Sequence, residues 1–353
     1  MAGSLPGEWH RVARRASQRL IYRSQGERDD CPACGSHALH DFDVLPLRAG
    51  RTGFVCGCDE CGLVFSNPQP TAAELEEFYS VSGSWAVDRQ HLDNHDDHAQ
   101  LGRSWTRLFE AMRDRVDVAA PPPGASVLDF GCGEGTMLDV LQSCGWQTSG
   151  IETASDHAFA RHRRLEVIPD APTFDLVLAL HVLEHVPSPL QLLRQLAAAC
   201  RIGGHILVAV PRLDTLPAHR DYRYVLNGRA HIMAYTGRCL EALLVRSGWE
   251  IVASPLDFAR GKPLDVARGK PPGQITRRIR VLARRTDTPA GHAHVGAEVA
   301  RAAIAGYYAQ EDVRPLAARL GLIRLAARRA DAGRRRAKAA RKALAVARES
   351  KDR

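Results

Sequence analysis

Two cysteine pairs in the first fifth of the sequence have the spacing of metal ligands. Each pair has the form Cys-x-x-Cys-Gly, with 23 residues between the pairs, and the four residues are Cys31, Cys34, Cys58 and Cys61. Four thiolates can bind one Zn²⁺ tetrahedrally, and the glycine after each pair permits the turn that points backbone N–H groups at sulfur. Cys56 lies nearby, but only Cys58 keeps the spacing. Because four protein ligands leave no open position on the ion, the pattern predicts structural Zn²⁺.

A glycine-rich turn is the second feature with chemical meaning. In SVLDFGCGEGTML (126–138) an apolar run ends at Asp129, glycines follow on alternate positions, and a helical pattern begins. Such glycines permit positive φ and let a ligand approach the backbone closely. The third glycine comes one residue too early for the dinucleotide pattern G-x-G-x-x-G, and Glu134 would repel a phosphate at the helix start. Glu152, about 20 residues after the first glycine, can accept hydrogen bonds from ribose hydroxyls. The spacing favours a nucleoside ligand without a phosphate over a plain structural turn.

The elements that position these residues follow from the hydrophobic pattern. Residues 125–285 alternate apolar runs with helical patterns, which predicts βαβ units and an α/β, doubly wound, mostly parallel sheet. The expected strands are 126–130, 148–152, 175–181, 205–211, 249–258 and 278–283. Five regions are expected along the chain: a basic N-terminal segment (1–30), a zinc ribbon (31–70), a helical connector (71–120), the α/β domain (125–285) and a basic Ala/Arg-rich helical tail (286–353).

Composition excludes several classes of protein. The 353 residues are 45% hydrophobic and 25% charged, which fits about two globular domains and argues against a disordered chain. No run approaches the ~20 apolar residues of a membrane helix, so no transmembrane segment is expected. The N-terminal residues lack the apolar core of a secretory signal. Nine cysteines in such a chain are expected to be reduced or to bind metal, which favours a cytoplasmic location.

The α/β part of the sequence resembles the class I S-adenosyl-L-methionine-dependent methyltransferases. VLDFGCGEG (127–135) looks like their motif I, FDLVLALHVLEHVPSP (174–189) like their fourth strand and the loop after it, and GGHILVAVP (203–211) like their fifth strand. The resemblance covers roughly 125–285 and implies a Rossmann-like seven-stranded sheet of order 3-2-1-4-5-7-6. It also implies S-adenosyl-L-methionine as the cofactor. The cofactor-binding residues it implies are Asp129, Gly131, Cys132, Gly133, Gly135, Glu152 and His181.

The ribbon followed by this domain is similar to a group that includes the sugar C-methyltransferases. That resemblance, over roughly 31–255, implies a small-molecule acceptor such as a nucleotide-linked sugar. His185 matches a histidine proposed as the base in those enzymes, Glu184 precedes it, and Tyr79 matches a tyrosine that can reach the substrate. The alternative for Glu184 and His185 is that they cap the loop by hydrogen bonding. The candidate acceptor residues lie after the fifth strand, and they are Tyr222, Tyr224, His231 and Tyr235.

One stretch departs from the family's pattern. Between Glu152 and Phe174 the chain has too few residues for the usual helix, third strand and loop. The family places an adenine-contacting acid in that loop, and Asp170 is the candidate here. Either the third strand is vestigial or adenosine is held differently.

Two other functions remain to be weighed, an RNA methyltransferase because of the charge distribution and a non-catalytic scaffold because of the shortened third strand. The net charge is +8, but residues 277–353 hold 20 Lys and Arg against 7 Asp and Glu, so the rest of the chain is slightly acidic. The basic tail could bind nucleic acid in an RNA methyltransferase, yet the catalytic portion does not favour that partner. A non-catalytic scaffold with a methyltransferase fold is the third interpretation. The sequence leaves the oligomeric state open.

Overall fold

The computed structural model describes most of the chain between the ribbon and the last strand of the α/β domain. The described residues are 28–46, 52–80, 106, 116, 118, 120–153, 162–213, 225–226, 228, 230–253 and 278–287. Most of the basic N-terminal segment, of the helical connector and of the Ala/Arg-rich tail therefore lies outside the described residues, as do Tyr222 and Tyr224. Within the described part, no helix is long and apolar enough to cross a membrane.

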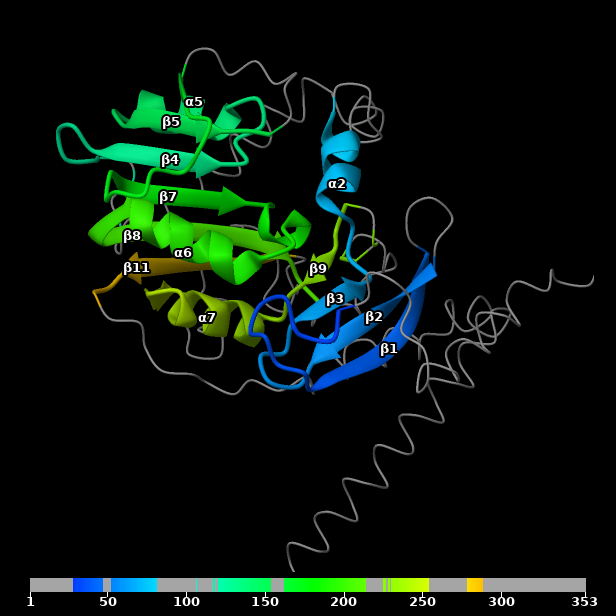
Figure 1. Cartoon of the computed structure of the whole chain (residues 1–353). Helices are drawn as coiled ribbons and strands as arrows, with labels where there is room; N and C mark the ends of the chain where they lie inside the picture. Colours follow the sequence, from blue (N-terminus) through cyan, green and yellow to red (C-terminus); the bar gives the residue numbers. More distant parts are fainter. Residues whose placement is uncertain are drawn as a thin grey trace, which may run out of the picture.

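A seven-stranded sheet forms the centre of the molecule (Figure 1). Its order is β10-β11-β8-β7-β4-β5-β6, in which β11 is antiparallel to both neighbours and the other pairs are parallel. The strands are β4 (Ser126–Phe130), β5 (Gln147–Ile151), β6 (Arg163–Arg164), β7 (Phe174–Leu180), β8 (Cys200–Pro211), β10 (Trp249–Ala253) and β11 (Arg278–Arg285). Renumbered along the chain, this is the order 3-2-1-4-5-7-6, so the predicted α/β doubly wound fold is confirmed.

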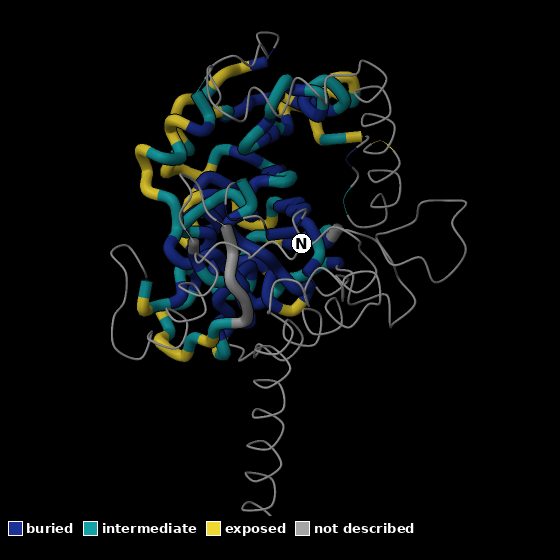
Figure 2. The backbone as a smooth tube through the Cα atoms, turned by 90° about the vertical axis from the view of Figure 1, so that its right-hand side faces the viewer, coloured by how far each residue is buried: buried dark blue, intermediate teal, exposed yellow. Residues whose placement is uncertain are grey.

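Alternating side chains of the central strands build two separate cores. Val127 belongs to a core with α5 (Thr136–Ser143), whereas its neighbour Leu128 belongs to a core with α6 (Pro189–Ala199) and α7 (Gly237–Arg246). Successive strand residues point to opposite faces, so apolar residues at every position require helices on both faces. In Figure 2 the buried residues, in dark blue, gather in the interior of the described part of the molecule.

The third strand of the family's pattern is reduced to two residues. β6 pairs with β5 only through Ser149↔Arg163 and Gly150↔Arg164. Next to it, the buried His162 bridges the Thr148 hydroxyl at 2.8 Å and the Asp139 carboxylate at 3.0 Å. The shortened stretch seen in the sequence therefore corresponds to a very short edge strand, while the candidate acid Asp170 is exposed.

The ribbon forms a second, antiparallel sheet of order β1-β2-β3-β9. Its strands are β1 (Leu39–Pro46), β2 (Thr52–Cys58), β3 (Val64–Asn67) and β9 (Met233–Ala234). After β3 the chain enters α2 (Ala72–Tyr79), whose first turn is fixed by a capping box between Thr71 and Glu74. β9 comes from the α/β part of the chain, and the ribbon cysteines share one apolar core with α6 and α7. The ribbon is thus joined to the α/β domain by strand pairing and by a common core.

Candidate active site and cysteine cluster

The glycine turn after β4 has the conformation that its sequence requires. Gly131, Gly133 and Gly135 have φ of 74°, 55° and 79°, a region that side chains other than glycine adopt rarely. A Cβ atom at Gly131 would lie 2.6 Å from Cγ2 of Val182, so this glycine also permits a close approach of the next loop. A Cβ atom at Gly133 would meet nothing within 4 Å. The turn is therefore tight on one side and open on the other, where a ligand can approach the backbone.

Two carboxyl groups face this turn. Glu152 accepts a 2.8 Å hydrogen bond from the backbone N–H of Gly133, which places the predicted ribose-binding acid directly beside the glycines. Asp129 is 3% exposed, and its Oδ1 has no hydrogen-bond partner among the described residues. Burial, with a smaller contribution from the charge of Glu152, raises the pKa of Asp129 to about 8. The site therefore contains one carboxylate, Glu152, that can accept hydrogen bonds. It also contains one carboxyl group, Asp129, that keeps its proton at neutral pH because it is buried.

The loop after β7 contains a second polar cluster at the same edge of the sheet. His181 has φ of 59°, uncommon for a non-glycine residue, and its Nδ1–H donates to Oε1 of Glu184 at 3.1 Å. Glu184 lies in the short helix η2 (Leu183–His185), and its side chain is 1% exposed. Burial by itself would raise the pKa of Glu184, but the hydrogen bond from His181 and the nearby imidazoles lower it to about 2. Glu184 is therefore ionised although it is buried, because hydrogen-bond donors around a carboxylate stabilise its charged form.

Three residues predicted from distant parts of the sequence meet at this loop. The ring centroid of His185 lies 6.4 Å from that of Tyr79 and 4.8 Å from that of His231. The Nδ1 of His185 lies 2.9 Å from the carbonyl oxygen of Ala230. Tyr235 differs from the other candidates, because it is fully buried and its hydroxyl donates to the carbonyl of Leu183 at 2.9 Å. It supports the loop from behind.

The pairing of β3 with β9 was not foreseen from the sequence, although it holds this cluster together. The N–H of Ser66 in the ribbon donates to the carbonyl of Ile232, and the N–H of Ile232 donates to the carbonyl of Glu184, at 2.9 and 2.8 Å. One chain of backbone hydrogen bonds therefore connects the ribbon to the polar loop. A strand of two residues leaves no alternating pattern in a sequence, so only the two hydrophobic residues of β9 could have hinted at it.

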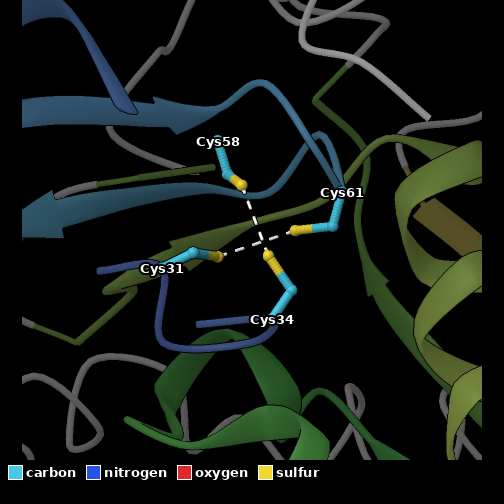
Figure 3. Close-up of side chains that lie close together, drawn as sticks. All are labelled: Cys31, Cys34, Cys58 and Cys61. Carbon is cyan, nitrogen blue, oxygen red and sulfur yellow. Dashed lines mark hydrogen bonds between the residues drawn. The ribbon is translucent and has the colours of Figure 1, made fainter. Parts of the chain in front are cut away.

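The four ribbon cysteines converge as their spacing predicts (Figure 3). Their sulfur atoms lie within 4.8 Å of one another, with Cys31–Cys61 at 3.6 Å and Cys34–Cys58 at 3.4 Å. Tetrahedral ligands at about 2.3 Å from Zn²⁺ are about 3.8 Å apart, so the arrangement fits that ion. Cys56 lies outside the cluster, where its thiol donates to Asp41 at 3.0 Å.

A cavity of about 510 Å³ lies at the opposite edge of the sheet, near the amino ends of β4 and β5. Its lining includes Ser126, Trp146 and His162. The polar atoms of these three side chains already bond within the protein: the indole N–H of Trp146 donates to the carbonyl of Val118, the hydroxyl of Ser126 donates to the carbonyl of Thr173, and His162 bonds to Thr148 and Asp139. Ligands of open α/β sheets bind at the carboxyl ends of the strands, so the glycine turn and not this cavity has the usual position of an active site.

Comparisons with known proteins agree on one kind of domain. A family model described as "Methyltransferase domain" matches residues 104–254. The chain is 28% identical over 174 residues to a ubiquinone biosynthesis O-methyltransferase of Xanthomonas campestris pv. campestris, a match over 43% of this chain and 67% of that protein. It is 33% identical over 99 residues to the protein of the same name from Vibrio parahaemolyticus, over 24% of this chain and 42% of the relative.

Two solved methyltransferase structures are similar to this chain at low sequence identity. A 1,6-didemethyltoxoflavin-N1-methyltransferase of Burkholderia thailandensis is 18% identical, with 69% of this chain and all of that chain covered and a TM-score of 0.40. An S-adenosylmethionine-dependent methyltransferase of Mesorhizobium loti is also 18% identical, with 50% and 98% covered and a TM-score of 0.35.

Proposed function

The chain is a class I S-adenosyl-L-methionine-dependent methyltransferase, and from this premise we propose that it methylates a hydroxyl group of a small molecule. One observation carries the proposal: the glycine turn with Glu152 and the cluster of Glu184, His185 and His231 follow β4 and β7, which are neighbours in the parallel sheet. Ligands of open α/β sheets bind at the carboxyl ends of their strands. Cofactor and acceptor would therefore share one edge of the sheet.

We propose that the glycine turn holds the nucleoside part of the cofactor. Glu152 uses part of its acceptor capacity on Gly133, and a carboxylate can accept further hydrogen bonds from ribose hydroxyls. The backbone around Cys132 and the His181 side chain would complete the site. The cofactor supplies a methyl group on a positively charged sulfur, and the protein needs to position an oxygen in line with it and remove the proton of that oxygen.

His185 is the residue that we propose to take the hydroxyl proton. The carbonyl of Ala230 can only accept, so Nδ1 of His185 carries the hydrogen and Nε2 of the neutral ring has the lone pair. Nε2 lies 4.0 Å from Oε1 of Glu184, and this carboxylate would stabilise the imidazolium once the proton is transferred. Glu184 would therefore act by charge and by positioning.

The acceptor would lie against Tyr79 and His231, which flank His185. Both offer polar atoms suited to a polyhydroxylated ligand, and we propose nucleotide-linked sugars as the first acceptor class to test. The name O-methyltransferase of the curated relatives supports an oxygen atom as the methyl acceptor. Tyr235, buried behind the loop, is not included among the proposed substrate contacts.

We also propose that the ribbon cysteines hold one structural Zn²⁺. The positive φ of 72° and 73° at Gly35 and Gly62 gives each Cys-x-x-Cys pair the turn that such ribbons need. We also propose a reducing compartment, the cytoplasm, because a thiolate site of this kind needs reduced cysteines. Metal analysis of the purified protein is expected to give about one Zn²⁺ per chain. Protein that folds with no bound metal would exclude the site.

Calorimetry and a methyl-transfer assay test the function. We expect S-adenosyl-L-methionine to bind the wild-type chain, and Glu152→Gln to weaken this binding at least tenfold because an amide accepts hydrogen bonds less well than a carboxylate. Glu166→Gln, which changes an exposed carboxylate two residues after the edge strand β6, is the matched control. Release of S-adenosylhomocysteine with a panel of nucleotide-sugars would identify the acceptor. Absence of cofactor binding would favour a scaffold, and turnover with RNA alone would refute the small-molecule acceptor.

A further inference from the structure

The cavity at the amino ends of the strands has a structural cause in the short connection between β6 and β7. Only residues 165–173 join the two strands, and they contain no helix. A crossover between parallel strands usually takes about a dozen residues or more and contains a helix. Leu165 and Ile168 of the connection pack against the core with α6 and α7, and the cavity lies beside the first residues of β4, β5, β6 and β7. Its volume of about 510 Å³ is in the range of small-molecule sites, about 300–1,000 Å³.

Part of the polar lining has no hydrogen-bond partner among the described residues. Whereas the side chains discussed above bond within the protein, four other side chains of the lining do not, and these are Gln142, Gln147, Ser149 and Arg163. All four can donate hydrogen bonds. Ser149 is only 5% exposed and lines the cavity, so its hydroxyl depends on the contents of the cavity for a hydrogen bond. The cavity therefore offers unused donors to a ligand.

Ser149 and Arg163 lie on the same face of the sheet. They are register partners on the parallel strands β5 and β6, and side chains of such partners point the same way. Ser149 is also the register partner of Leu128, which belongs to the core with α6 and α7. Arg164 follows Arg163 on β6, points to the opposite face and is not part of the lining. One guanidinium and one hydroxyl of neighbouring strands therefore meet at the cavity.

The charge of the lining is positive. None of the described residues that line the cavity is Asp or Glu. Arg201 is offset by Asp175, whose carboxylate accepts from the guanidinium at 2.5 Å, whereas Arg163 forms no ion pair with a described residue. The end of α5 lies nearby, but its carbonyls at Leu141 and Gln142 already accept from backbone N–H groups. One uncompensated positive charge therefore stands among neutral donors, which favours an anionic ligand.

We propose that this cavity is a binding site for a small organic anion with a phosphate or carboxylate group. Arg163 binds the anionic oxygens, since a planar guanidinium can donate two parallel hydrogen bonds to either group. Ser149 donates a further hydrogen bond. The site goes beyond the proposed function, because it lies at the amino edge of the sheet, away from the glycine turn and the loop of His185. The anion is therefore neither the cofactor nor the methyl acceptor, and no bond is made or broken there.

Isothermal titration calorimetry of the full-length protein, in a low-salt buffer without phosphate, tests the site. The probes are glucose 6-phosphate, citrate and, as the uncharged control, glucose. We expect at least one of the two anions to bind, which distinguishes a phosphate site from a carboxylate site, and glucose not to bind. Arg163→Gln should weaken anion binding at least tenfold, because it removes charge-assisted hydrogen bonds. Ser149→Ala should weaken it about threefold. Arg164→Gln removes the same charge from the next residue of β6 and should change the affinity less than about twofold.

Three outcomes would overturn the site: no binding of either anion by the wild type, equal binding of glucose, or unchanged affinity in a folded Arg163→Gln variant. Circular dichroism checks the folding of each variant. Saturating S-adenosyl-L-methionine gives a second test and should leave the affinity for the anion within about twofold. Displacement of the anion by the cofactor would overturn the separate location. Anion binding by a protein that does not bind S-adenosyl-L-methionine would overturn the proposed function and support this inference.

Discussion

Asp129 shows how burial changes the chemistry of one residue in the glycine turn. Its folded-state pKa of about 8 lies above the value of about 3.9 expected in an unfolded chain. Between these values the folded state holds a proton that the unfolded chain has released, so this group makes the free energy of unfolding fall as pH rises from about 4 to about 8. Ionised Asp129 is therefore destabilising at alkaline pH.

Asp129→Asn tests this relation, because an amide is close in shape to the protonated acid and cannot ionise. Thermal unfolding without cofactor should give the variant a higher midpoint than the wild type at pH 9, by several degrees, and a much smaller difference at pH 5. Asp170→Asn removes an exposed carboxylate and should leave the midpoint nearly unchanged at both pH values. A difference that does not depend on pH would show that Asp129 is already ionised in the folded state.

His185 can be separated from cofactor binding by a second substitution. His185→Gln keeps a polar side chain but removes the ring nitrogen that we propose to take the hydroxyl proton. We expect kcat to fall by about 10²–10⁴-fold, the usual contribution of such a group. The affinity for S-adenosyl-L-methionine should stay within about twofold, because the proposed cofactor contacts are the glycine turn, Glu152 and His181 and do not include His185. Unchanged kcat would mean that Glu184 and His185 only cap the loop, the alternative that the sequence left open.

At the scale of elements, the turn between β4 and α5 is constrained by its neighbour. Gly131→Ala places a methyl group 2.6 Å from Cγ2 of Val182 at a φ of 74°, whereas Gly133→Ala meets open space at a φ of 55°. Both variants carry backbone strain of about 1 kcal/mol, and only the first adds a clash. Gly131→Ala should therefore lower the unfolding free energy by about 2–4 kcal/mol, against about 1 kcal/mol for Gly133→Ala. Chemical denaturation measures both, and equal losses would mean that Val182 moves aside freely.

Local sequence signals were sufficient for most elements of the sheet. β4 begins and ends where its apolar run predicts, and β5 and β7 differ from the expected ranges by one residue, because strand ends depend on hydrogen bonds to neighbours. β8 begins at Cys200, five residues before its expected start, since the pair Gly203-Gly204 suggested a turn where the strand in fact continues. β10 ends at Ala253, as far as the described residues extend there.

The candidate site was only partly predictable for a different reason. Motif spacing along the chain identified Glu152, the cysteine pairs and the loop of His185, since each lies within a short segment. The convergence of Tyr79, His185 and His231 depends on the packing of α2, η2 and the segment before β9, and no local pattern encodes it. Likewise, the sequence marked Tyr235 as a polar loop residue, but the pairing of β9 with β3 buries it.

At the scale of the whole molecule, the ribbon and the α/β domain behave as one structure. Cys31, Cys58 and Cys61 are buried in the same core as Leu240 and Leu243 of α7, and β3 pairs with β9. A ribbon that only added stability would not need a backbone connection to the loop of Glu184. The hydrogen bonds from Ser66 to Ile232 and from Ile232 to Glu184 supply that connection. Loss of the ribbon metal should therefore disturb catalysis as well as folding.

Cys34→Ser tests this coupling, because it removes one thiolate and leaves the rest of the cluster. We expect the thermal midpoint to fall and kcat to fall more than tenfold at a temperature where the protein is still folded, with cofactor affinity retained, because the proposed cofactor contacts all come from the α/β domain. Cys56→Ser, a thiol outside the cluster that donates to Asp41, is the matched control and should retain both metal and turnover. Metal content, circular dichroism and initial rates are measured on the same preparations. If Cys34→Ser loses its metal and stability while kcat is unchanged, the loop of Glu184 holds its position without the ribbon, and the hydrogen bonds through Ile232 contribute to folding alone.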